Sequence, residues 1–155
     1  MKASLLSTLK FHWKKILLGL FVLGLAIQFL PVDRSAPPTD GEVPASPEVR
    51  AVLKKACYDC HSNQTQWPLY SRIAPVSWLV ARDVHEGRKE LNFTAWNHLT
   101  PERQAKKLRK SWEEVDEGEM PMEIYVPLHP EARLTAAEKS LLKEWALSAG
   151  NSGRP

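Results

Sequence analysis

The sequence contains little cysteine and few apolar β-branched runs, and each shortage argues against a class of functional site. Cys57 and Cys60 are the only cysteines among the 155 residues. A structural zinc site usually needs a second pair of such ligands, so zinc is not expected. A thioredoxin-like dithiol is expected beside a strand–helix–strand pattern, and the chain has no run rich in isoleucine and valine to supply the strands. A simple dithiol and a disulfide stay open at this point.

The chain also lacks acidic residues before Asp33, and it lacks a strongly basic domain. Its formal net charge is +3, from 21 lysines and arginines against 18 acidic residues. Four lysines precede residue 31, so the remainder has 17 basic side chains (21 less 4) against 18 acidic ones. No basic patch interleaved with aromatic residues stands out, and a nucleic-acid-binding domain is therefore not indicated.

The two cysteines belong to the run Cys57-Tyr58-Asp59-Cys60-His61. A Cys-x-x-Cys-His run is the attachment signature of a c-type haem. On a helical turn, positions i, i+3 and i+4 share a face, so both sulfurs and the imidazole can reach one flat ring. We therefore predict one covalent haem c per chain, with Cys57 and Cys60 as thioether anchors and His61 as the proximal iron ligand.

The first 30 residues have the layout of an export segment. Residues 16–30 form an apolar run that follows four lysines and is interrupted only by Gly19, Gly24 and Gln28. A positive flank and then an apolar segment are typical of a signal peptide or an uncleaved signal anchor. Extended back through Phe11, the run approaches the roughly 20 residues that cross a bilayer as a helix. No suitable small-x-small site follows the apolar core, so we favour an uncleaved anchor, with a cleaved export signal as the alternative.

The lysines also predict the topology of the chain. The positive-inside rule keeps them in the cytoplasm and sends the rest of the chain outward. We therefore predict a single-pass protein of the bacterial inner membrane, with a cytoplasmic N-terminus and a periplasmic haem domain. This compartment is one where c-type haem is usually attached, so the predicted location agrees with the cysteine motif.

Residues 31–46 separate the membrane segment from the rest of the chain. The stretch Pro31–Pro47 contains five prolines with Asp, Ser, Thr and Gly among them. This composition predicts an extended tether and not a packed element. We accordingly divide the chain into an anchor at residues 1–30, a tether at 31–46 and a haem-binding domain at 47–150.

Four helices are predicted in the domain. The first starts at Ser46-Pro47-Glu48, with a serine N-cap, proline at the first helical position and an acid in the first turn. Its apolar stripe is expected to run straight on to Cys57 and Cys60. The others are predicted at 76–87 with Gly87 as its stop, at 100–118 with Gly118 as its stop, and at 135–150, where Thr135 and Glu138 form a capping box and Gly150 ends the helix.

These elements predict an all-α fold. It is a small cytochrome c-like helical domain around a covalent haem, preceded by one N-terminal transmembrane helix. A domain of this size is near the lower end for stability, and the haem would supply much of its core. The polar loop at 62–75 is expected to follow the haem edge, and the carbonyl of Pro68 or Pro75 is the expected acceptor for the second ring nitrogen of His61.

A sulfur ligand for the other face of the iron is offered by Met120. A thioether is a neutral, soft sixth ligand, and His/Met ligation raises the reduction potential and leaves no open coordination site. Pro121 follows Met120 and limits the backbone there. Met122, two residues away, is the alternative sulfur ligand. Bis-His ligation is the other alternative, from His85, His98 or His129, of which the last follows the methionines most closely.

Several further runs are distinctive when they are taken together with the cysteine motif. They are Trp67-Pro68-Leu69-Tyr70-Ser71, Ile73-Ala74-Pro75-Val76-Ser77-Trp78, Gly87-Arg88, Leu91-Asn92-Phe93 with Trp96, Gly118-Glu119-Met120-Pro121, Leu128-His129-Pro130 and the helix of residues 134–145. With these runs, residues 47–147 resemble the small bacterial haem-binding domain family, which is similar to single-haem c-type cytochromes. The resemblance implies covalent haem c at Cys57, Cys60 and His61, with Met120 at the distal position. Met122 departs from the pattern, in which a second proline is expected after Met-Pro.

The expected function is electron transfer by a membrane-tethered, extracytoplasmic c-type cytochrome. An electron carrier is expected and not an enzyme, because His/Met ligation suits electron transfer better than oxygen chemistry. Its partners would be redox proteins and the membrane, with no organic substrate and no nucleic acid. The alternative is a haem-based enzyme or a gas or peroxide sensor, in which the methionine is absent or displaceable.

Overall fold

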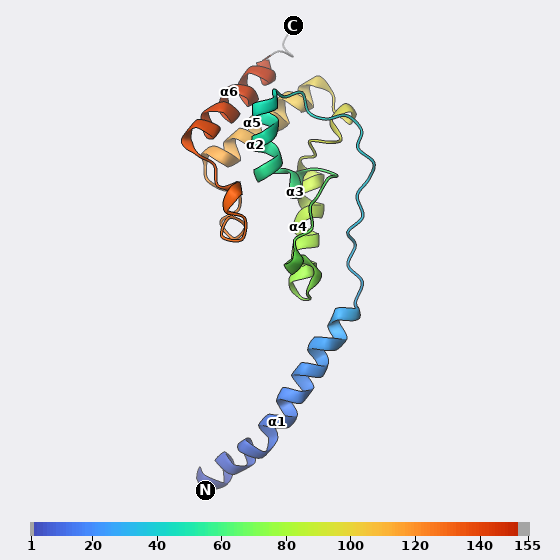
Figure 1. Cartoon of the computed structure of the whole chain (residues 1–155), viewed down its shortest axis with the longest axis vertical. Coiled ribbons are helices and arrows are strands. Elements are labelled where there is room, and N and C mark those ends of the chain that lie inside the picture. The colour runs from blue at the N-terminus through green and yellow to red at the C-terminus, as the bar shows by residue number, and fades with distance from the viewer. Residues whose placement is uncertain (1, 152–155) are drawn as a thin grey trace. The chain divides into compact units, whose positions relative to one another are not determined.

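The chain forms helices joined by turns and loops, as the computed structural model shows for residues 2–151 (Figure 1). The α-helices are α1 (Lys2–Ala26), α2 (Pro47–Ala56), α3 (Tyr58–His61), α4 (Val76–Glu90), α5 (Pro101–Asp116) and α6 (Ala136–Asn151). Short 3-10 turns lie at Ile27–Phe29, Leu69–Arg72, Trp96–His98 and Pro130–Ala132. These described residues contain no β-strand, so the prediction of an all-α chain with one apolar N-terminal helix is confirmed.

The described residues divide into two compact units. Those up to Arg34 form the first unit together with Trp67–Ala81. Ser35–Gln66 form the second unit together with the described residues from Arg82 onward. The cysteine motif, Met120 and Met122 belong to the second unit.

Helix α1 and the 3-10 turn that follows it provide a stretch, His12–Phe29, that is long and apolar enough to cross a membrane. At 1.5 Å per residue, these 18 residues span roughly 27 Å, close to the roughly 30 Å of a bilayer's hydrocarbon core. Large apolar side chains such as Leu20, Phe21 and Leu23 are exposed along it. The structure therefore supplies a helix of the predicted kind, and its crossing of a membrane stays a prediction.

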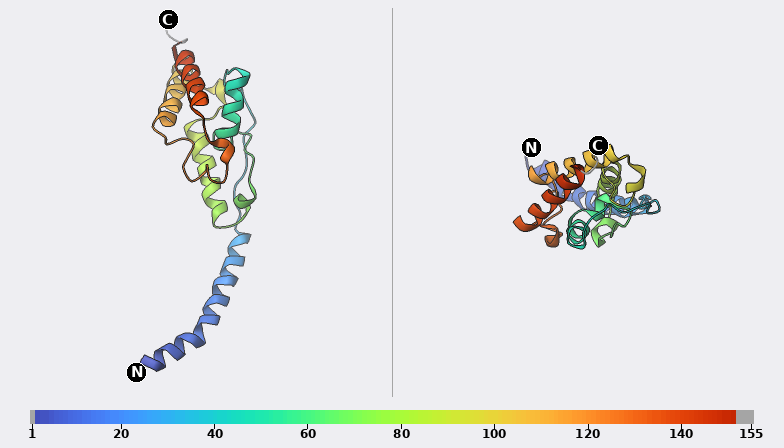
Figure 2. Two further views of the ribbon diagram at one scale, coloured as in Figure 1. Left: turned by 60° about the vertical axis from the view of Figure 1, so that its left-hand side comes forward. Right: turned by 90° about the horizontal axis from the view of Figure 1, so that it is seen from above.

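Helices α2, α5 and α6 surround the core of the second unit, and α5 and α6 lie side by side in both views (Figure 1, Figure 2). Phe93 and Trp96, which follow α4, close this core with their ring centroids 6.5 Å apart. The helices contribute apolar residues at helical spacing, which are Val49, Val52, Leu53, Leu108, Trp112, Val115, Leu142 and Ala146. The core thus follows from the amphipathic pattern of each helix.

The predicted helix starts are present as side-chain caps. The Ser46 hydroxyl accepts from the Val49 amide at 3.3 Å, and the Thr100 hydroxyl accepts from the Arg103 amide at 3.4 Å. At α6 the capping box is complete, because the Thr135 amide donates to the Glu138 carboxylate and the Glu138 amide donates back to the Thr135 hydroxyl. Such caps satisfy amides that have no partner within the helix.

The proline-rich segment is packed over part of its length, and this corrects the expectation of a tether without packing. Residues 31–46 have no regular secondary structure, as their composition predicts. However, Val43 is 1% exposed, and its amide donates to the Phe93 carbonyl at 2.8 Å. The Asp40 amide donates to the Thr94 carbonyl in the same way, also at 2.8 Å. Composition predicted the extended backbone, but it did not show that another extended segment supplies its hydrogen bonds.

Two predicted helix stops are wrong, and one is right. Helix α4 continues through Gly87 to Glu90, and α6 continues through Gly150 to Asn151. Gly118 does end α5, since it takes φ +84° just beyond the C-cap residue Glu117. A glycine in a helix is therefore not always a stop, and Gly87 has a different role that is described below.

Candidate functional site

The cysteine motif lies on a short helix of its own. Helix α2 ends at Ala56, and Cys57 takes φ −129° and ψ −34°, outside helical geometry. The amides of Cys60 and His61 both donate to the Cys57 carbonyl, at 3.2 and 2.8 Å, which forms the single turn of α3. The expectation of one straight stripe from α2 to Cys60 is therefore wrong. The chain turns at Cys57 once α2 has made its last backbone bond, from the Cys57 amide to the Leu53 carbonyl.

The His61 ring is held by two backbone carbonyls at the C-terminal end of α4. Its Nδ1 lies 2.9 Å from the Gly87 oxygen and 3.1 Å from the Leu91 oxygen. Both partners are carbonyls, which only accept, so Nδ1 carries the proton and Nε2 keeps its lone pair. Burial lowers the pKa of His61, although the same two backbone bonds act in the opposite direction. A neutral imidazole with a free Nε2 is the form that binds a metal.

These acceptors differ from the predicted ones, Pro68 or Pro75. The carbonyls in the last turn of a helix have no regular partner further along the helix, so the end of α4 is a natural place for an acceptor. The bonds join residues 26 and 30 positions apart in the chain. No local pattern in the sequence encodes such a pairing.

Gly87 allows α4 to pass directly against the cysteine motif. A Cβ at this position would lie 2.7 Å from the carbonyl oxygen of Cys60 and 3.1 Å from its Cβ. The first distance is below any normal contact with a backbone atom, so only glycine fits here. Gly87 therefore sets the crossing of the two helices and also supplies one acceptor for His61. Its presence in the middle of a helical pattern was the available signal for this role.

Both cysteine thiols are protonated at neutral pH in this environment. Burial raises the pKa of Cys57 to about 12, and the neighbouring Cys60 adds to this effect. Burial likewise raises the pKa of Cys60 to about 11, with Asp59 and Asp83 adding to it. The reactive cysteines of dithiol oxidoreductases have a lowered pKa. The structure therefore counts against the redox-dithiol alternative.

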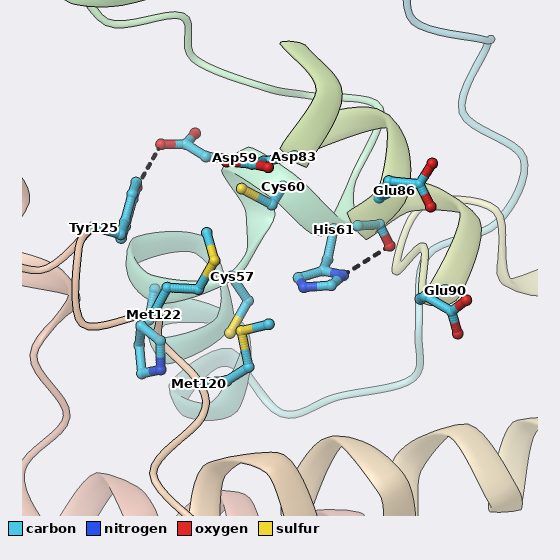
Figure 3. A pocket seen from close by; sticks show the side chains of 13 residues that line it. Cys57, Asp59, Cys60, His61, Asp83, Glu86, Glu90, Met120, Met122 and Tyr125 are labelled. Carbon is cyan, nitrogen blue, oxygen red and sulfur yellow. Dashed lines mark hydrogen bonds between the residues drawn. The ribbon is translucent and has the colours of Figure 1, made fainter. Parts of the chain in front are cut away.

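The segment after α5 brings two methionines to the same place. Beyond the turn at Gly118, the Met120 amide donates to the Glu114 carbonyl at 3.0 Å, which folds the chain back along the end of α5. Met120 packs against the core and Met122 follows it on the same segment. In Figure 3, both side chains point toward the space beside Cys57 and His61.

Two adjoining cavities, of about 230 and 220 Å³, occupy this space. Both are lined by His61, Cys57 and Met120, together with Ala56 and Glu90. Cys60 and Met122 line the first cavity and not the second. The structure thus brings together all four predicted site residues, Cys57, Cys60, His61 and Met120. Their roles as ligands stay predictions.

The two cavities differ in charge. Four carboxylates line the first, from Asp59, Asp83, Glu86 and Glu90. Figure 3 shows Glu86 and Glu90 on the other side of the His61 ring from the methionines, and Asp83 beside Cys60. Lys107 and Lys110 are found in the second cavity beside Glu90 and Glu114, and Lys107 bonds the Glu90 main-chain carbonyl. A ligand with acidic groups would therefore find its cationic partners in the second cavity.

The other histidines lie apart from this arrangement. His98 pairs with Asp40 at 3.0 Å. The His129 ring stacks on Tyr125 with centroids 4.0 Å apart, and its Nδ1 lies 3.2 Å from the Glu131 carboxylate. Neither of these rings, nor that of His85, lines either cavity. The arrangement favours methionine over bis-His ligation.

Polar contacts of Tyr125 and Arg88, which the sequence did not predict, stabilise the segments around the cysteine motif. The Tyr125 hydroxyl donates to the Asp59 carboxylate at 2.8 Å, and so joins the methionine segment to α3 (Figure 3). Arg88 donates to the Ser62 carbonyl at 2.7 Å and to the Thr65 hydroxyl at 2.8 Å, and so fixes the loop after the motif.

The lining suits a haem. Its exposed surface is predominantly apolar, as a porphyrin ring requires. The donor set consists of two thiols, a neutral imidazole oriented by α4, and a thioether, all facing shared space. These are the residue types that hold a c-type haem and its iron.

Comparison with known proteins gives an independent result. The model of a family described as the haem-binding domain matches residues 22–148, which include the cysteine motif and both cavity methionines. Searches of curated proteins and of solved structures gave no match. The family match supports haem binding. It covers most of the chain, and the protein therefore belongs to the haem-binding domain family.

Proposed function

We propose that this protein is a membrane-tethered, extracytoplasmic c-type cytochrome that holds one covalent haem c and carries electrons. The observation that supports the proposal most strongly is that His61, Cys57 and Met120 line the same pair of cavities. An imidazole and a thioether facing a common space form the ligand pair of electron-transfer cytochromes. The family match supports the haem itself.

Each residue has a separate role in this proposal. Cys57 and Cys60 hold the haem through thioether bonds, which fixes its position without a binding equilibrium. His61 offers Nε2 to the iron because its Nδ1 is engaged by α4. Met120 would hold the iron through its sulfur, and the apolar lining would exclude water. When bound, the haem supplies one-electron chemistry at its iron.

Helix α1 supplies the tether in this proposal. Its length fits a bilayer, and its four lysines all precede the apolar run of residues 16–30. By the positive-inside rule, the chain crosses the inner membrane of a bacterium once and exposes the haem domain in the periplasm. Such a protein would accept electrons from one redox protein and donate them to another, with no organic substrate.

Covalent attachment is tested by a pyridine haemochrome assay on protein produced with an intact haem-attachment system. The wild-type chain is expected to give the spectrum of haem c after acid extraction, at one haem per chain. Cys57→Ala with Cys60→Ala is expected to release the haem into the extract, and Ser62→Ala serves as a matched control. A wild-type chain whose haem extracts freely would contradict covalent attachment.

The distal ligand is tested by carbon monoxide. The ferrous wild-type protein is expected to be six-coordinate, low-spin and unreactive with carbon monoxide. Met120→Ala is expected to open the iron to carbon monoxide, whereas Met122→Ala, two residues away on the same segment, is expected to leave it closed. Ready binding by the wild-type protein would instead support the alternative, a haem-based enzyme or a gas or peroxide sensor.

A further inference from the structure

Residues 67–81 bury several small side chains and expose five large apolar ones. Ser71, Ala74 and Ser77 are 0%, 9% and 2% exposed. The large apolar residues are exposed over much of their surface, namely Leu69 (77%), Ile73 (55%), Val76 (41%), Trp78 (36%) and Leu79 (56%). We call these five residues the apolar face. Large apolar side chains that are exposed within one short segment mark an interaction surface and not a folding core.

The composition of the segment indicates the kind of surface that it meets. Among residues 67–81 the single charged side chain is that of Arg72, which is exposed, and there is no acidic residue. Three aromatic residues, Trp67, Tyr70 and Trp78, accompany the aliphatic ones. Tryptophan, tyrosine and an occasional cation among aliphatic residues are typical of segments at the boundary between lipid and water.

Hydrogen bonds fix this segment beside the C-terminal end of the apolar helix. The Gln28 side chain accepts from the Ala74 amide at 2.9 Å and donates to the Ala74 carbonyl at 3.2 Å. Gln28 lies at the end of the stretch that is long enough to cross a bilayer, His12–Phe29. In both views the end of α1 lies beside the turn that precedes α4 (Figure 1, Figure 2).

A second contact strengthens the same junction. The Arg34 guanidinium donates to the Ser71 carbonyl at 2.7 Å and lies over the Trp67 ring at 5.8 Å. Phe29, the last residue of the apolar stretch, is itself 87% exposed. Because this residue follows Gln28 directly, exposed apolar surface is present on both partners of the junction.

We propose that the apolar face lies in the interface of the bilayer that α1 crosses, with its large side chains among the outer acyl chains and Arg72 near the lipid phosphates. The proposal rests on the membrane tether of the proposed function and adds a second, separate membrane contact to it. Lipid is the occupant because Ala74, which follows Ile73 of the apolar face, is bonded to Gln28, and Gln28 directly precedes the last residue of the membrane-spanning stretch. With a flexible tether alone, residues 67–81 could take any orientation relative to the membrane. The second contact fixes that orientation.

The test uses the full-length protein with its haem in vesicles of phosphatidylethanolamine and phosphatidylglycerol. The vesicles contain a trace of phosphatidylcholine that carries a photoactivatable diazirine on one acyl chain. After illumination and digestion, mass spectrometry locates the lipid adducts along the chain. Adducts on α1 measure the tether, and adducts on residues 67–81 measure the proposed contact. The peptide with Ile124, which is 80% exposed and belongs to the other unit, is the reference.

The expected result is adducts on both α1 and residues 67–81, with a yield on the latter roughly tenfold above the Ile124 peptide because only an inserted face meets acyl chains. Adducts on α1 without adducts on residues 67–81 would overturn the inference and leave the tether intact. Failure to label α1 would contradict the tether itself. Cross-links between two protein chains through residues 67–81, in place of lipid adducts, would also overturn the inference, because a second copy would then cover the face.

A pair of substitutions separates insertion from chance proximity. Ile73→Asp with Leu79→Asp places charges on two exposed positions, where folding does not depend on the original side chains. These changes are expected to abolish adducts on residues 67–81 and to leave those on α1 unchanged. Ile124→Asp, an equally exposed aliphatic residue, is the control and is expected to change neither. Persistent labelling of the double variant would overturn the inference.

Discussion

The two sides of the cavities are held by different kinds of contact. On the histidine side, backbone carbonyls of α4 fix the ring of His61, and α4 meets α3 without an intervening side chain at Gly87. On the methionine side, a loop carries Met120, whose amide bonds the Glu114 carbonyl of α5. A hydrogen bond between side chains, from Tyr125 to Asp59, joins this loop to α3. Backbone contacts between helices tolerate little adjustment, whereas a loop held by side chains can move as they do. The difference predicts a rigid histidine side and an adjustable methionine side.

Gly87→Ala should break the rigid side and have the largest effect. The new Cβ would lie 2.7 Å from the Cys60 carbonyl, and such overpacking costs about 1–3 kcal/mol even though alanine favours a helix. We expect a lower urea midpoint and a lower ratio of haem to protein. Lys89→Ala, on the exposed face of the same helix, is the control. A Gly87→Ala protein that matches this control in both measurements would show that the helices do not cross as described.

Tyr125→Phe should loosen the adjustable side and leave the rigid side intact. Removing the bond to Asp59 is expected to lower the free energy of unfolding by about 1 kcal/mol. It should also make the ferrous protein react measurably with carbon monoxide, which the wild-type protein is not expected to do, because the methionine segment would leave the iron more often. Leu128→Ala, an exposed change on the same segment, provides the comparison. Unchanged carbon monoxide kinetics would indicate that Met120 is held by other contacts.

Glu138 lies on neither side of the cavities, so Glu138→Gln tests only the stability of the fold. Bonds from Lys55 and from Thr135 hold the pKa of Glu138 below its usual value. A carboxyl with a lowered pKa stabilises the fold above its unfolded pKa, and this contribution is lost as the pH falls through the folded pKa. We therefore expect Glu138→Gln to cost about 0.5–1 kcal/mol at pH 7 and the difference to shrink below about pH 4.5.

This pH dependence is followed by urea unfolding at a series of pH values. Glu144→Gln, an exposed change on the same helix, should show neither the loss at pH 7 nor its pH dependence. A constant difference between Glu138→Gln and wild type down to pH 3 would mean that the carboxylate charge does not matter.

Neutralising the acidic wall of the first cavity should have the smallest effect. Glu86 and Glu90 line it beside His61, and negative charge near the iron favours the oxidised state. Replacing either by glutamine is expected to raise the reduction potential on the order of 20 mV, the Coulomb effect of one charge about 10 Å away in water. Spectroelectrochemical titration measures the shift against Glu144→Gln. A fall in potential would contradict the assigned position of the iron.

Local sequence was sufficient to predict how the helices begin. Ser46, Thr100 and Thr135 each cap the helix that the pattern assigned to them, because a cap involves residues only three positions apart. The gathering of His61 and Met120 was also predicted, from the chemistry that a cysteine–histidine motif requires and not from local structure.

Contacts between distant segments could not be predicted in the same way. From the sequence alone, Gly87 has the features of a helix stop, because its contact with Cys60 is visible only in the folded chain. The acceptors of His61 likewise come from residues 26 and 30 positions away. Gly41 is a similar case, since its positive φ and its closeness to the Asn97 side chain become apparent only in the folded chain. In each case, the position of the residue in the tertiary structure determined its role.

The packing of the proline-rich segment determines where a soluble version of this protein can start. Val43 is buried in the core, and the Pro44 carbonyl accepts from the Trp145 indole at 2.9 Å, so the beginning and the end of the folded unit meet. Truncation at Pro47 would remove a buried valine, worth about 1.5–3 kcal/mol, and leave that indole without its partner. A fragment designed for crystallisation or spectroscopy should therefore begin no later than Asp40, seven residues before the first helix of the domain.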